Sequence, residues 1–377
     1  MSSPPFGKGR LGGIFKALKC FDNSSDEPYL ESRLWFILDK SDEGGRRMRI
    51  DVHNHLLSAD IFERIESRTS FRPGRGSQSK TSINARVGPV VPDISIEERI
   101  REMDEHGIDR QFLSFLTDNV FAEETLKESP AKRLELSRVI NDYLAEITRQ
   151  HPDRFMAFAD IPLLDIDDAI RELRRAVKEL GLHGVTLWTN IHGMPLNSKR
   201  FWPLYAELNT LEVPVFLHPT EPREKQGLQE FNLAAMVGFP FETTLAASRL
   251  VYSGLFENFK QLRIILNHVG GVIPFLWERL NRGYMNNWQG CRENISKLPT
   301  EYLKCFYYDT ALSFPEALLF AFKLIGEHLL FGTDYPYTSK KMSNELEKNV
   351  KMIENLNLTR EEKERIFSLN ALKIVSR

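Results

Sequence analysis

From Met48 onward, short apolar runs alternate with longer amphipathic segments. This alternation is typical of repeated strand–helix units, in which helices cover buried parallel strands. Eight apolar runs are candidate strands: 49–52, 111–115, 155–159, 184–187, 215–217, 264–266, 306–308 and 329–331. Eight such units predict an α/β fold of the TIM (β/α)8 barrel type.

The amphipathic segments carry signals for where each helix begins and ends. In SIEERIREMDEHG, apolar residues recur at helical spacing, and Gly107 stands where a C-terminal cap belongs. In DIDDAIRELRRAVKELG, either Asp165 or Asp167 is the expected N-cap, and Gly181 is the expected stop. Both segments are therefore predicted to be helices of the barrel.

Two stretches interrupt this alternation of apolar runs and amphipathic segments. The longest insertion follows the first strand, where SRTSFRPGRGSQSKTSINARVGPVVPD is polar and broken by Gly and Pro. Residues 1–47, which are rich in Gly, Pro and Ser at their start, read as an N-terminal extension before a catalytic domain of residues 48–377. We interpret the extension as a disordered segment or, if Met48 is the true start, as no part of the native protein. A doubly wound open sheet is the alternative architecture, but no GxGxxG loop supports it.

Composition narrows the class of partner. With 42% hydrophobic and 27% charged residues, the chain resembles an ordinary globular protein. A formal net charge of -2 and scattered basic residues give no nucleic-acid surface, so a small-molecule substrate is expected. Three widely spaced cysteines without CxxC spacing fit a reducing cytoplasm. Because no apolar segment approaches the roughly 20 residues of a membrane-spanning helix, we expect no membrane partner.

The nine histidines can be sorted by which end of a strand they occupy, because TIM barrels place their chemistry at the C-terminal ends. His106 and His151 close helices, and His183 and His328 precede strands, so all four are expected to be structural. The remaining histidines follow strands at the expected catalytic face: His53, His55, His192, His218 and His268.

Four of the residues at this face form a plausible metal site. Residues i and i+2 of a strand point the same way, so His53 and His55 can bind one ion together. His218 ends the fifth strand in VFLHPT, and Asp334 lies just beyond the eighth in LLFGTDYPY. Three imidazoles and a carboxylate suit zinc or a similar borderline divalent ion, with room for a water. An HxH pair alone is a weak signal, but this combination is a strong one.

The motifs DVHNH, FLHP, NHVGG and LFGTDYP, in this order and spacing, resemble the amidohydrolase superfamily. Within it they are most similar to the branch of aminocarboxymuconate semialdehyde decarboxylase and related aromatic acid decarboxylases. The likeness extends from Met48 to the C-terminus and implies a barrel of the metal-dependent hydrolase type. It also implies that His53, His55, His218 and Asp334 bind metal and that His268 is a catalytic acid and base.

The resemblance further implies that Arg86, in NARVGP, and Arg279, in FLWERL, hold substrate carboxylates. In the decarboxylase the second arginine reaches in from a neighbouring subunit, so a homodimer is implied. The alternative for each arginine is a solvated surface charge or a helix ion pair. The bridging lysine of binuclear relatives is missing from GVTLWTN, which favours one metal. Histidine stands at both positions of the first motif, unlike the Glu-x-His of some manganese-dependent relatives, so zinc is favoured over manganese.

Our first hypothesis is a metal-dependent, non-oxidative decarboxylase (a carboxy-lyase) of an aromatic or unsaturated carboxylic acid. The alternative is a hydrolase (a lactonase, esterase or amidohydrolase) that uses the same mononuclear site. A non-catalytic metal-binding barrel is disfavoured, because His268 would be an unnecessary fifth polar group. The sequence has HPT where the family has HPW, so the substrate is expected to differ. Trp188, Asn190, His192 and Tyr337 are candidates for lining the pocket.

Overall fold

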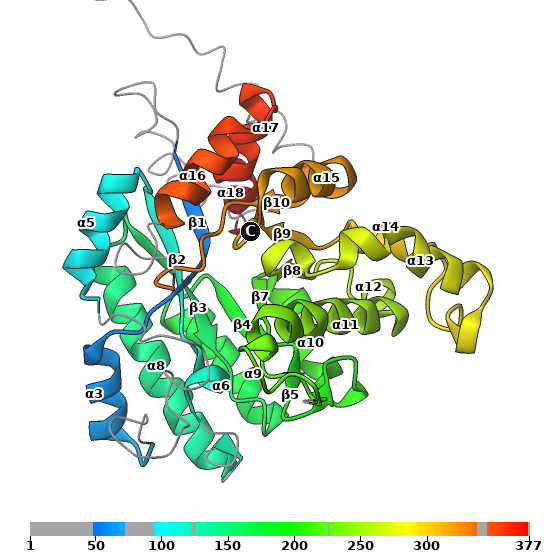
Figure 1. The fold of residues 1–377 in the computed structure, drawn as a ribbon. Coiled ribbons are helices and arrows are strands. Elements are labelled where there is room, and N and C mark those ends of the chain that lie inside the picture. The colour runs from blue at the N-terminus through cyan, green and yellow to red at the C-terminus, as the bar shows by residue number, and fades with distance from the viewer. Residues whose placement is uncertain are drawn as a thin grey trace, which may run out of the picture. The chain divides into compact units, whose positions relative to one another are not determined.

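A computed structural model describes residues 48–71, 94–121, 126–127, 129–224, 226–337 and 345–375. Eight of its strands pair in parallel in chain order, which confirms the predicted barrel (Figure 1). These strands are β1 (Ile50–His55), β2 (Arg110–Ser114), β3 (Phe155–Asp160), β4 (Gly184–Trp188), β7 (Pro214–His218), β8 (Arg263–Leu266), β9 (Tyr307–Asp309) and β10 (Leu329–Leu330). Each predicted strand overlaps one of them.

The sheet closes on itself between its first and last strands. The backbone N–H of Val52 donates to the carbonyl of Phe331 at 2.9 Å, and that of His55 donates to Tyr335 at 2.7 Å. A parallel bridge between Asn54 and Tyr335 extends the same contact. The segment that carries Asp334 is therefore held directly beside the histidine-bearing strand.

Helices follow the strands and surround them (Figure 1). The longer ones are α3 (Ala59–Arg68), α5 (Ile96–His106), α8 (Pro130–Gln150), α9 (Ile166–Arg174), α10 (Trp202–Leu211), α11 (Phe239–Tyr252), α13 (Ile273–Met285), α15 (Pro315–Ile325) and α16 (Glu345–Asn355). Shorter ones are α6 (Thr117–Val120), α12 (Leu255–Asn258), α14 (Pro299–Leu303), α17 (Arg360–Glu364) and α18 (Asn370–Val375). None of the helices within the described ranges is long and apolar enough to cross a membrane. The insertion predicted after the first strand falls largely on residues 72–93, outside the described residues.

The predicted helix boundaries agree with the structure. Gly107 follows α5 with a φ of 66°, the left-handed conformation of a C-cap. Of the two predicted caps of α9, Asp165 fills the position, because its carboxylate accepts a hydrogen bond from the backbone N–H of Asp168. Residues 175–179 continue α9 as a π-helical turn that ends just before Gly181.

The inside of the barrel is filled by aromatic rings. Phe112 of β2 stacks on Phe158 of β3 with ring centroids 4.9 Å apart, and Phe158 stacks on Phe216 of β7 at 5.1 Å. The ring of Phe216 then meets His53 edge-on at 5.1 Å. Since all of these rings are buried, they form a rigid apolar base directly beneath the first histidine.

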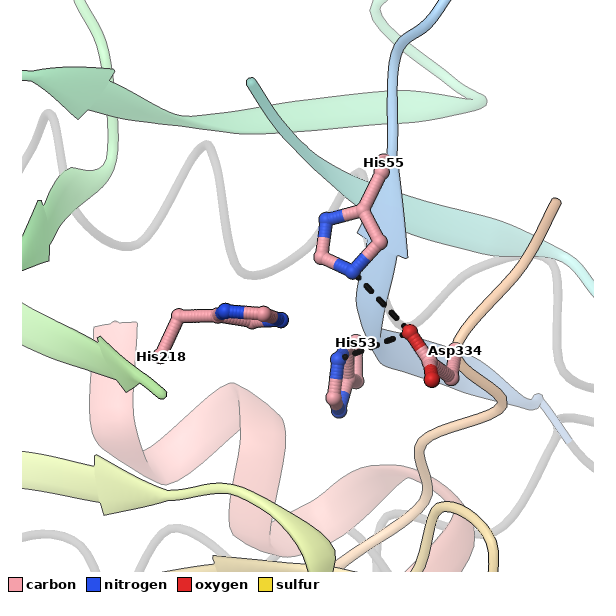
Figure 2. A group of neighbouring side chains, drawn as sticks. All are labelled: His53, His55, His218 and Asp334. Carbon is pink, nitrogen blue, oxygen red and sulfur yellow. Dashed lines mark hydrogen bonds and ion pairs between the residues drawn. The ribbon is translucent and has the colours of Figure 1, made fainter. Parts of the chain in front are cut away.

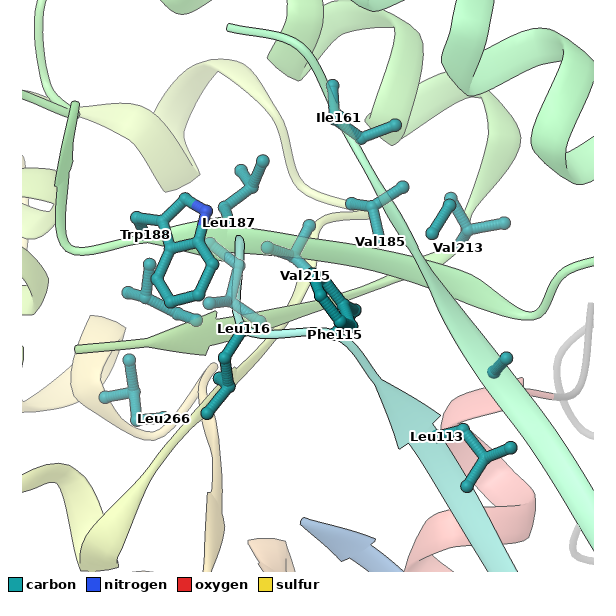
Figure 3. Packing of buried hydrophobic residues seen from close by; sticks show 14 of the residues in the cluster. Leu113, Phe115, Leu116, Ile161, Val185, Leu187, Trp188, Val213, Val215 and Leu266 are labelled. Carbon is teal, nitrogen blue, oxygen red and sulfur yellow. The ribbon is translucent and has the colours of Figure 1, made fainter. Parts of the chain in front are cut away.

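Residues between these positions face the helices. Val185 and Leu187 of β4 and Val215 of β7 belong to the apolar cluster that packs there (Figure 3). Burial of each such side chain contributes about 1.5–3 kcal/mol. Side chains of a strand alternate between its faces, so Phe216 and His218 share the opposite face. The alternation of side-chain direction along β7 thus points His218 into the barrel.

A buried group of polar side chains connects α8 to the C-terminal end of β3. The guanidinium of Arg133 donates from Nη1 to Oδ2 of Asp160 at 2.6 Å and from Nη2 to Oδ1 at 3.1 Å. The hydroxyls of Ser137 and Thr117 donate to the same carboxylate at 2.6 and 2.5 Å. All of them are buried. We call these four residues the Asp160 cluster.

Candidate active site

Four side chains converge at the C-terminal end of the barrel (Figure 2). His53 and His55 come from β1, His218 ends β7, and Asp334 lies just after β10. One nitrogen or oxygen atom from each side chain lies within 4.8 Å of the others, and all four residues are buried. Oδ1 of Asp334 is 3.2 Å from Nε2 of His53 and 3.0 Å from Nε2 of His55. The structure therefore brings together the four predicted metal ligands.

The conformation of β1 helps to aim the two histidines. Its pairing with β2 shifts register between Asp51 and Asn54, around His53. Such irregularities are common beside active sites, where they redirect side chains. The rings of His53 and His55 lie 5.1 Å apart and nearly perpendicular, at 79°. Each ring therefore presents its Nε2 edge to Asp334.

The other nitrogen of each imidazole is already occupied. Nδ1 of His53 lies 2.8 Å from Oδ2 of Asp309. Nδ1 of His55 lies 2.8 Å from the hydroxyl of Ser114, and Nδ1 of His218 lies 2.8 Å from the carbonyl of Pro219. Partners of this kind fix the orientation and tautomer of a metal-binding histidine.

The electrostatics of the group favour a bound cation. Burial alone would lower the pKa of His53, but the carboxylates of Asp309 and Asp334 raise it to about 10. Burial lowers the pKa of His55 to about 4 and, with the neighbouring histidines, lowers that of His218 well below its usual value. Burial would raise the pKa of Asp334, but His53 and hydrogen bonds from the histidines hold it well below its usual value. The neutral imidazoles of His55 and His218 thus adjoin an ionised carboxylate, and the raised pKa of His53 reflects the negative charge of Asp309 and Asp334 that a bound cation would balance.

This donor set fits one divalent metal ion. Three imidazole nitrogens and one carboxylate oxygen are ligands that zinc and similar ions accept. The Nδ1 atoms of His53 and His55 are engaged by Asp309 and Ser114, so it is the Nε2 atoms that point toward the shared centre. Strand β4 carries no lysine that could bridge a second ion.

His268 lies beside the group without joining it. Its Nε2 is 3.6 Å from Oδ2 of Asp334, and its ring is 5.0 Å from that of His53. Both ring nitrogens are buried, and neither makes a hydrogen bond to any described residue. The backbone of His268 has a φ of 54°, a strained conformation of the kind that clusters at active sites. An imidazole with both nitrogens available can transfer protons to a bound molecule.

Arg279, one of the two predicted arginines, is not part of this group. Arg86 lies outside the described residues. Arg279 lies on α13 and is exposed to solvent. Among the described residues, no ion pair is found for its guanidinium.

The predicted lining residues differ in their distance from the ligands. Trp188 packs edge-on against His218 at 5.6 Å, and Tyr337 packs against His55 at 6.0 Å. Asn190 instead holds a turn, because its side chain accepts from the backbone N–H of Gly193 at 2.8 Å. His192, with a φ of 51°, belongs to the same turn.

Sequence reasoning missed the residues that contact the Nδ1 atoms of the ligand histidines, above all Asp309. The motif YYDTA places this aspartate directly after the seventh predicted strand, which was a usable signal. Ser114 ends the second strand in the same way. Both positions follow the strand-end rule that located the histidines.

Comparison with known proteins supports this description. The sequence model of the amidohydrolase family matches residues 50–377. The chain is 29% identical to 2-amino-3-carboxymuconate-6-semialdehyde decarboxylase of Dictyostelium discoideum, over 78% of this chain and 82% of the relative. It is 34% identical to gamma-resorcylate decarboxylase of Polaromonas sp., over 64% of this chain and 77% of the relative.

A solved structure with the same fold is dihydroxybenzoic acid decarboxylase from Polaromonas sp. JS666, with bound manganese and the inhibitor 2-nitroresorcinol. The match has a TM-score of 0.68 and 24% identity, and covers 88% of this chain and 97% of that one. The resemblance read from the sequence motifs is thus confirmed. Because the family model spans nearly the whole barrel, the chain belongs to the amidohydrolase family.

Proposed function

We propose that the protein is a metal-dependent, non-oxidative decarboxylase of an aromatic or unsaturated carboxylic acid. The observation that carries this proposal is the buried group of His53, His55, His218 and Asp334, with the imidazole of His268 beside it, whose ring nitrogens make no hydrogen bond to a described residue. The relatives named above are decarboxylases, one of an amino-carboxymuconate semialdehyde and one of gamma-resorcylate. The shared feature of these names is a carboxylate on an unsaturated carbon skeleton.

In this proposal the four buried side chains hold one divalent ion. When bound, such an ion acts as a Lewis acid and orients the substrate. The Phe216 ring and the partners of the Nδ1 atoms keep the imidazoles from turning away. The substrate's ring or chain would then lie between this group and His268, near Trp188 and Tyr337.

His268 supplies the proton in the chemical step. Its ring nitrogen delivers a proton to the substrate carbon that bears the carboxylate. The bond from that carbon to the carboxylate then breaks, its electron pair restores the unsaturated system, and CO2 leaves. One proton is taken up for each CO2 released, so the step needs no oxidant or reductant. His268 regains its proton from solvent before the next turnover.

Product analysis tests this assignment. Purified protein is incubated with a panel of hydroxybenzoates, carboxymuconates and lactones, and both CO2 and organic products are measured. We expect CO2 and the decarboxylated product in equal amounts from at least one carboxylic acid. Ring opening of a lactone without CO2 release would instead indicate the hydrolase that the same site could support.

Zinc is the ion that we propose, because the first motif supplies two histidines and a third comes from β7. The dihydroxybenzoic acid decarboxylase contains manganese, so manganese is the alternative. Elemental analysis of protein purified without added metal distinguishes the two. Chelation should abolish turnover, and one equivalent of metal per chain should restore it. Two tightly held ions per active chain would contradict a mononuclear site.

We also propose that two copies of the chain associate through the region around Arg279. The large hydrophobic side chains that are exposed among the described residues all come from one stretch of the chain: Phe231, Met236, Val237, Phe241, Leu245, Phe275, Met285, Trp288, Leu312, Phe314 and Phe320. Phe275 is 70% exposed and precedes Arg279 by one turn of α13. Its ring lies 5.3 Å from that of Phe320 on α15. Apolar surface of this kind marks a protein contact.

A second copy is the proposed occupant because Arg279 shares this surface, and the family resemblance of the sequence implies an arginine that reaches in from a neighbouring subunit. Mixing tests the arrangement. Protein with Arg279→Ala and protein with His268→Ala are combined under conditions that exchange subunits. Hybrid dimers should regain one complete site, so activity should exceed that of either parent. No gain despite demonstrated exchange would show that the site is not shared.

Two coarser expectations belong to the same proposal. Residues 48–377 are proposed to form the catalytic domain, with residues 1–47 as an extension. A cytoplasmic location is proposed from the widely spaced cysteines. Mass spectrometry of the natively expressed protein tests the first, because a peptide from residues 1–47 would show that the extension is translated.

A further inference from the structure

One carboxylate contacts both a proposed metal ligand and the proposed proton donor. Asp309 ends β9 and is fully buried. Its Oδ2 lies 2.8 Å from Nδ1 of His53. Its Oδ1 accepts hydrogen bonds from the backbone N–H groups of His268 and Ala311, each at 3.0 Å. The two oxygens of one side chain thus reach a proposed metal ligand and the backbone of the proposed proton donor.

The contact with His53 fixes which ring nitrogen carries hydrogen. An ionised carboxylate only accepts hydrogen bonds, so Nδ1 of His53 must donate to Asp309. When His53 is neutral, as a metal ligand must be, its lone pair is then on Nε2, the nitrogen that lies 3.2 Å from Oδ1 of Asp334. The corresponding partner of His55 is the neutral hydroxyl of Ser114, which itself donates to a backbone carbonyl at 2.8 Å. Of the Nδ1 partners of the three ligand histidines, only Asp309 carries a charge.

The contact with His268 holds a strained turn. His268 and Val269 have φ values of 54° and 58°. Left-handed backbone is unfavourable for residues other than glycine, and particularly for a β-branched one such as valine. The turn persists because neighbouring groups fix it. Oδ1 of Asp309 holds its first N–H, and the carbonyl of Asn267 accepts from Gly270 at 3.0 Å.

Gly332 of the neighbouring segment makes room for this arrangement. A Cβ atom added to Gly332 would lie 2.9 Å from Cβ of Asp309 and 2.9 Å from Cβ of His53. Real Cβ atoms do not approach one another so closely. The glycine therefore allows His53 and Asp309 to lie side by side across the closing strand.

We propose that Asp309 is a positioning residue that orients His53 for metal binding and fixes the backbone from which His268 acts. The part that concerns His268 rests on the function proposed above, whereas the part that concerns His53 depends only on metal binding. Asp309 touches neither the substrate nor the reacting atoms in this proposal. Its effect passes through the ring of His53 and the backbone of His268.

The substitution Asp309→Asn separates the two contacts. The amide oxygen can still accept from His268 and Ala311, but the amide N–H₂ faces Nδ1 of His53. To accept that hydrogen bond, His53 must move its hydrogen to Nε2, where it blocks metal binding. We expect metal affinity, measured by competition with a chromophoric chelator, to fall about 10- to 100-fold, the range found for residues behind metal ligands. Turnover per bound metal should fall by less than about threefold once the metal is saturating.

The substitution Asp309→Ala removes both contacts. It should weaken metal binding about as much and, in addition, lower turnover per bound metal by at least about tenfold relative to Asp309→Asn, because the turn at His268 relaxes. Equal turnover of the two metal-saturated variants would overturn the role toward His268. If Asp309→Ala fails to fold, the metal affinity of Asp309→Asn still decides the role toward His53.

Asp160→Asn is the matched control. It also replaces a buried carboxylate at the C-terminal end of a strand, but Asp160 contacts Arg133 and hydroxyls rather than a ligand histidine. It should lower the melting temperature and leave metal affinity within about twofold of the original, since no ligand histidine depends on it. Wild-type metal affinity in Asp309→Asn, or an equal loss in both variants, would overturn the proposal. Chelator competition needs no substrate, so this result stands even if no decarboxylation is found.

Discussion

Two buried carboxylates at the same end of the barrel have opposite surroundings. Asp160 is surrounded by donors that complete its hydrogen bonding, including the permanent charge of Arg133. Asp334 faces the imidazoles of His53, His55 and His268 instead. Burial would lower the pKa of Arg133, yet Asp160 raises it, so that ion pair remains charged at any ordinary pH.

The difference separates structure from function. A buried ion pair that is fully hydrogen-bonded leaves no charge uncompensated. It connects structural elements, here α8 and β3. Among the described residues, the ion pairs found for Asp334 are all with imidazoles and none is with a lysine or arginine. The positive charge that balances the carboxylate of Asp334 has to come from a proton on an imidazole or from a bound cation. Buried carboxylates whose neighbours are imidazoles with aligned Nε2 atoms are therefore the ones to examine for chemistry.

Asp334→Ala should give the largest effect. Removing the charged ligand leaves three imidazoles without a complete site, so metal and turnover should be lost together. Elemental analysis and turnover on the same preparation check this. Thermal melting serves as the control for folding. A variant that keeps a full equivalent of metal would show that Asp334 has another role.

His268→Ala should have the next largest effect, and a different one. The four ligands remain, so we expect about one metal per chain to be retained and turnover to fall by roughly 10²- to 10⁴-fold, the contribution of general acid–base catalysis. Metal content, melting and turnover are measured together. Lost metal would make His268 a ligand, a collapsed melting temperature would make it structural, and near-normal turnover would remove it from the mechanism.

Arg133→Ala tests the other side of the comparison. It leaves the buried charge of Asp160 without its partner, which costs about 3–5 kcal/mol of unfolding free energy. Denaturant unfolding measures that cost. The metal content of the folded fraction should remain at one equivalent, because no ligand histidine contacts the Asp160 cluster among the interactions described. Loss of metal from folded Arg133→Ala protein would mean that the two carboxylate sites are coupled.

The sequence could predict the part of the site that depends on side-chain alternation along a strand and on which residues stand at the strand ends. Alternation along a strand placed His53 and His55 on one side, and strand-end positions placed His218 and Asp334 near them. The fold followed from the same alternation of apolar runs. These rules are local, and each needs only a few consecutive residues.

What sequence could not predict depends on register between distant strands. Nothing local to YYDTA says that Asp309 meets His53, because that contact spans 256 positions. Arg99 lies in an amphipathic helix, where an arginine is expected on the solvent face. It is instead 1% exposed, and its guanidinium donates to Asn54 and Gln111 on β1 and β2 at 3.2 and 3.0 Å. Such long-range pairing becomes visible only once the barrel is closed.

Arg279→Ala should give the smallest effect, because it removes an exposed charge that joins neither buried group. If Arg279 holds the substrate carboxylate, its loss removes a charge-assisted hydrogen bond worth about 1.5–3 kcal/mol, so KM should rise roughly 10- to 100-fold. Metal content should not change. Arg282→Ala is the matched control, since Arg282 is exposed on the same helix and pairs with Glu278 at 3.8 Å. An unchanged KM in Arg279→Ala, or an equal rise in both variants, would place Arg279 among ordinary surface charges, and the carboxylate would then need a different cation from the same or the partner subunit.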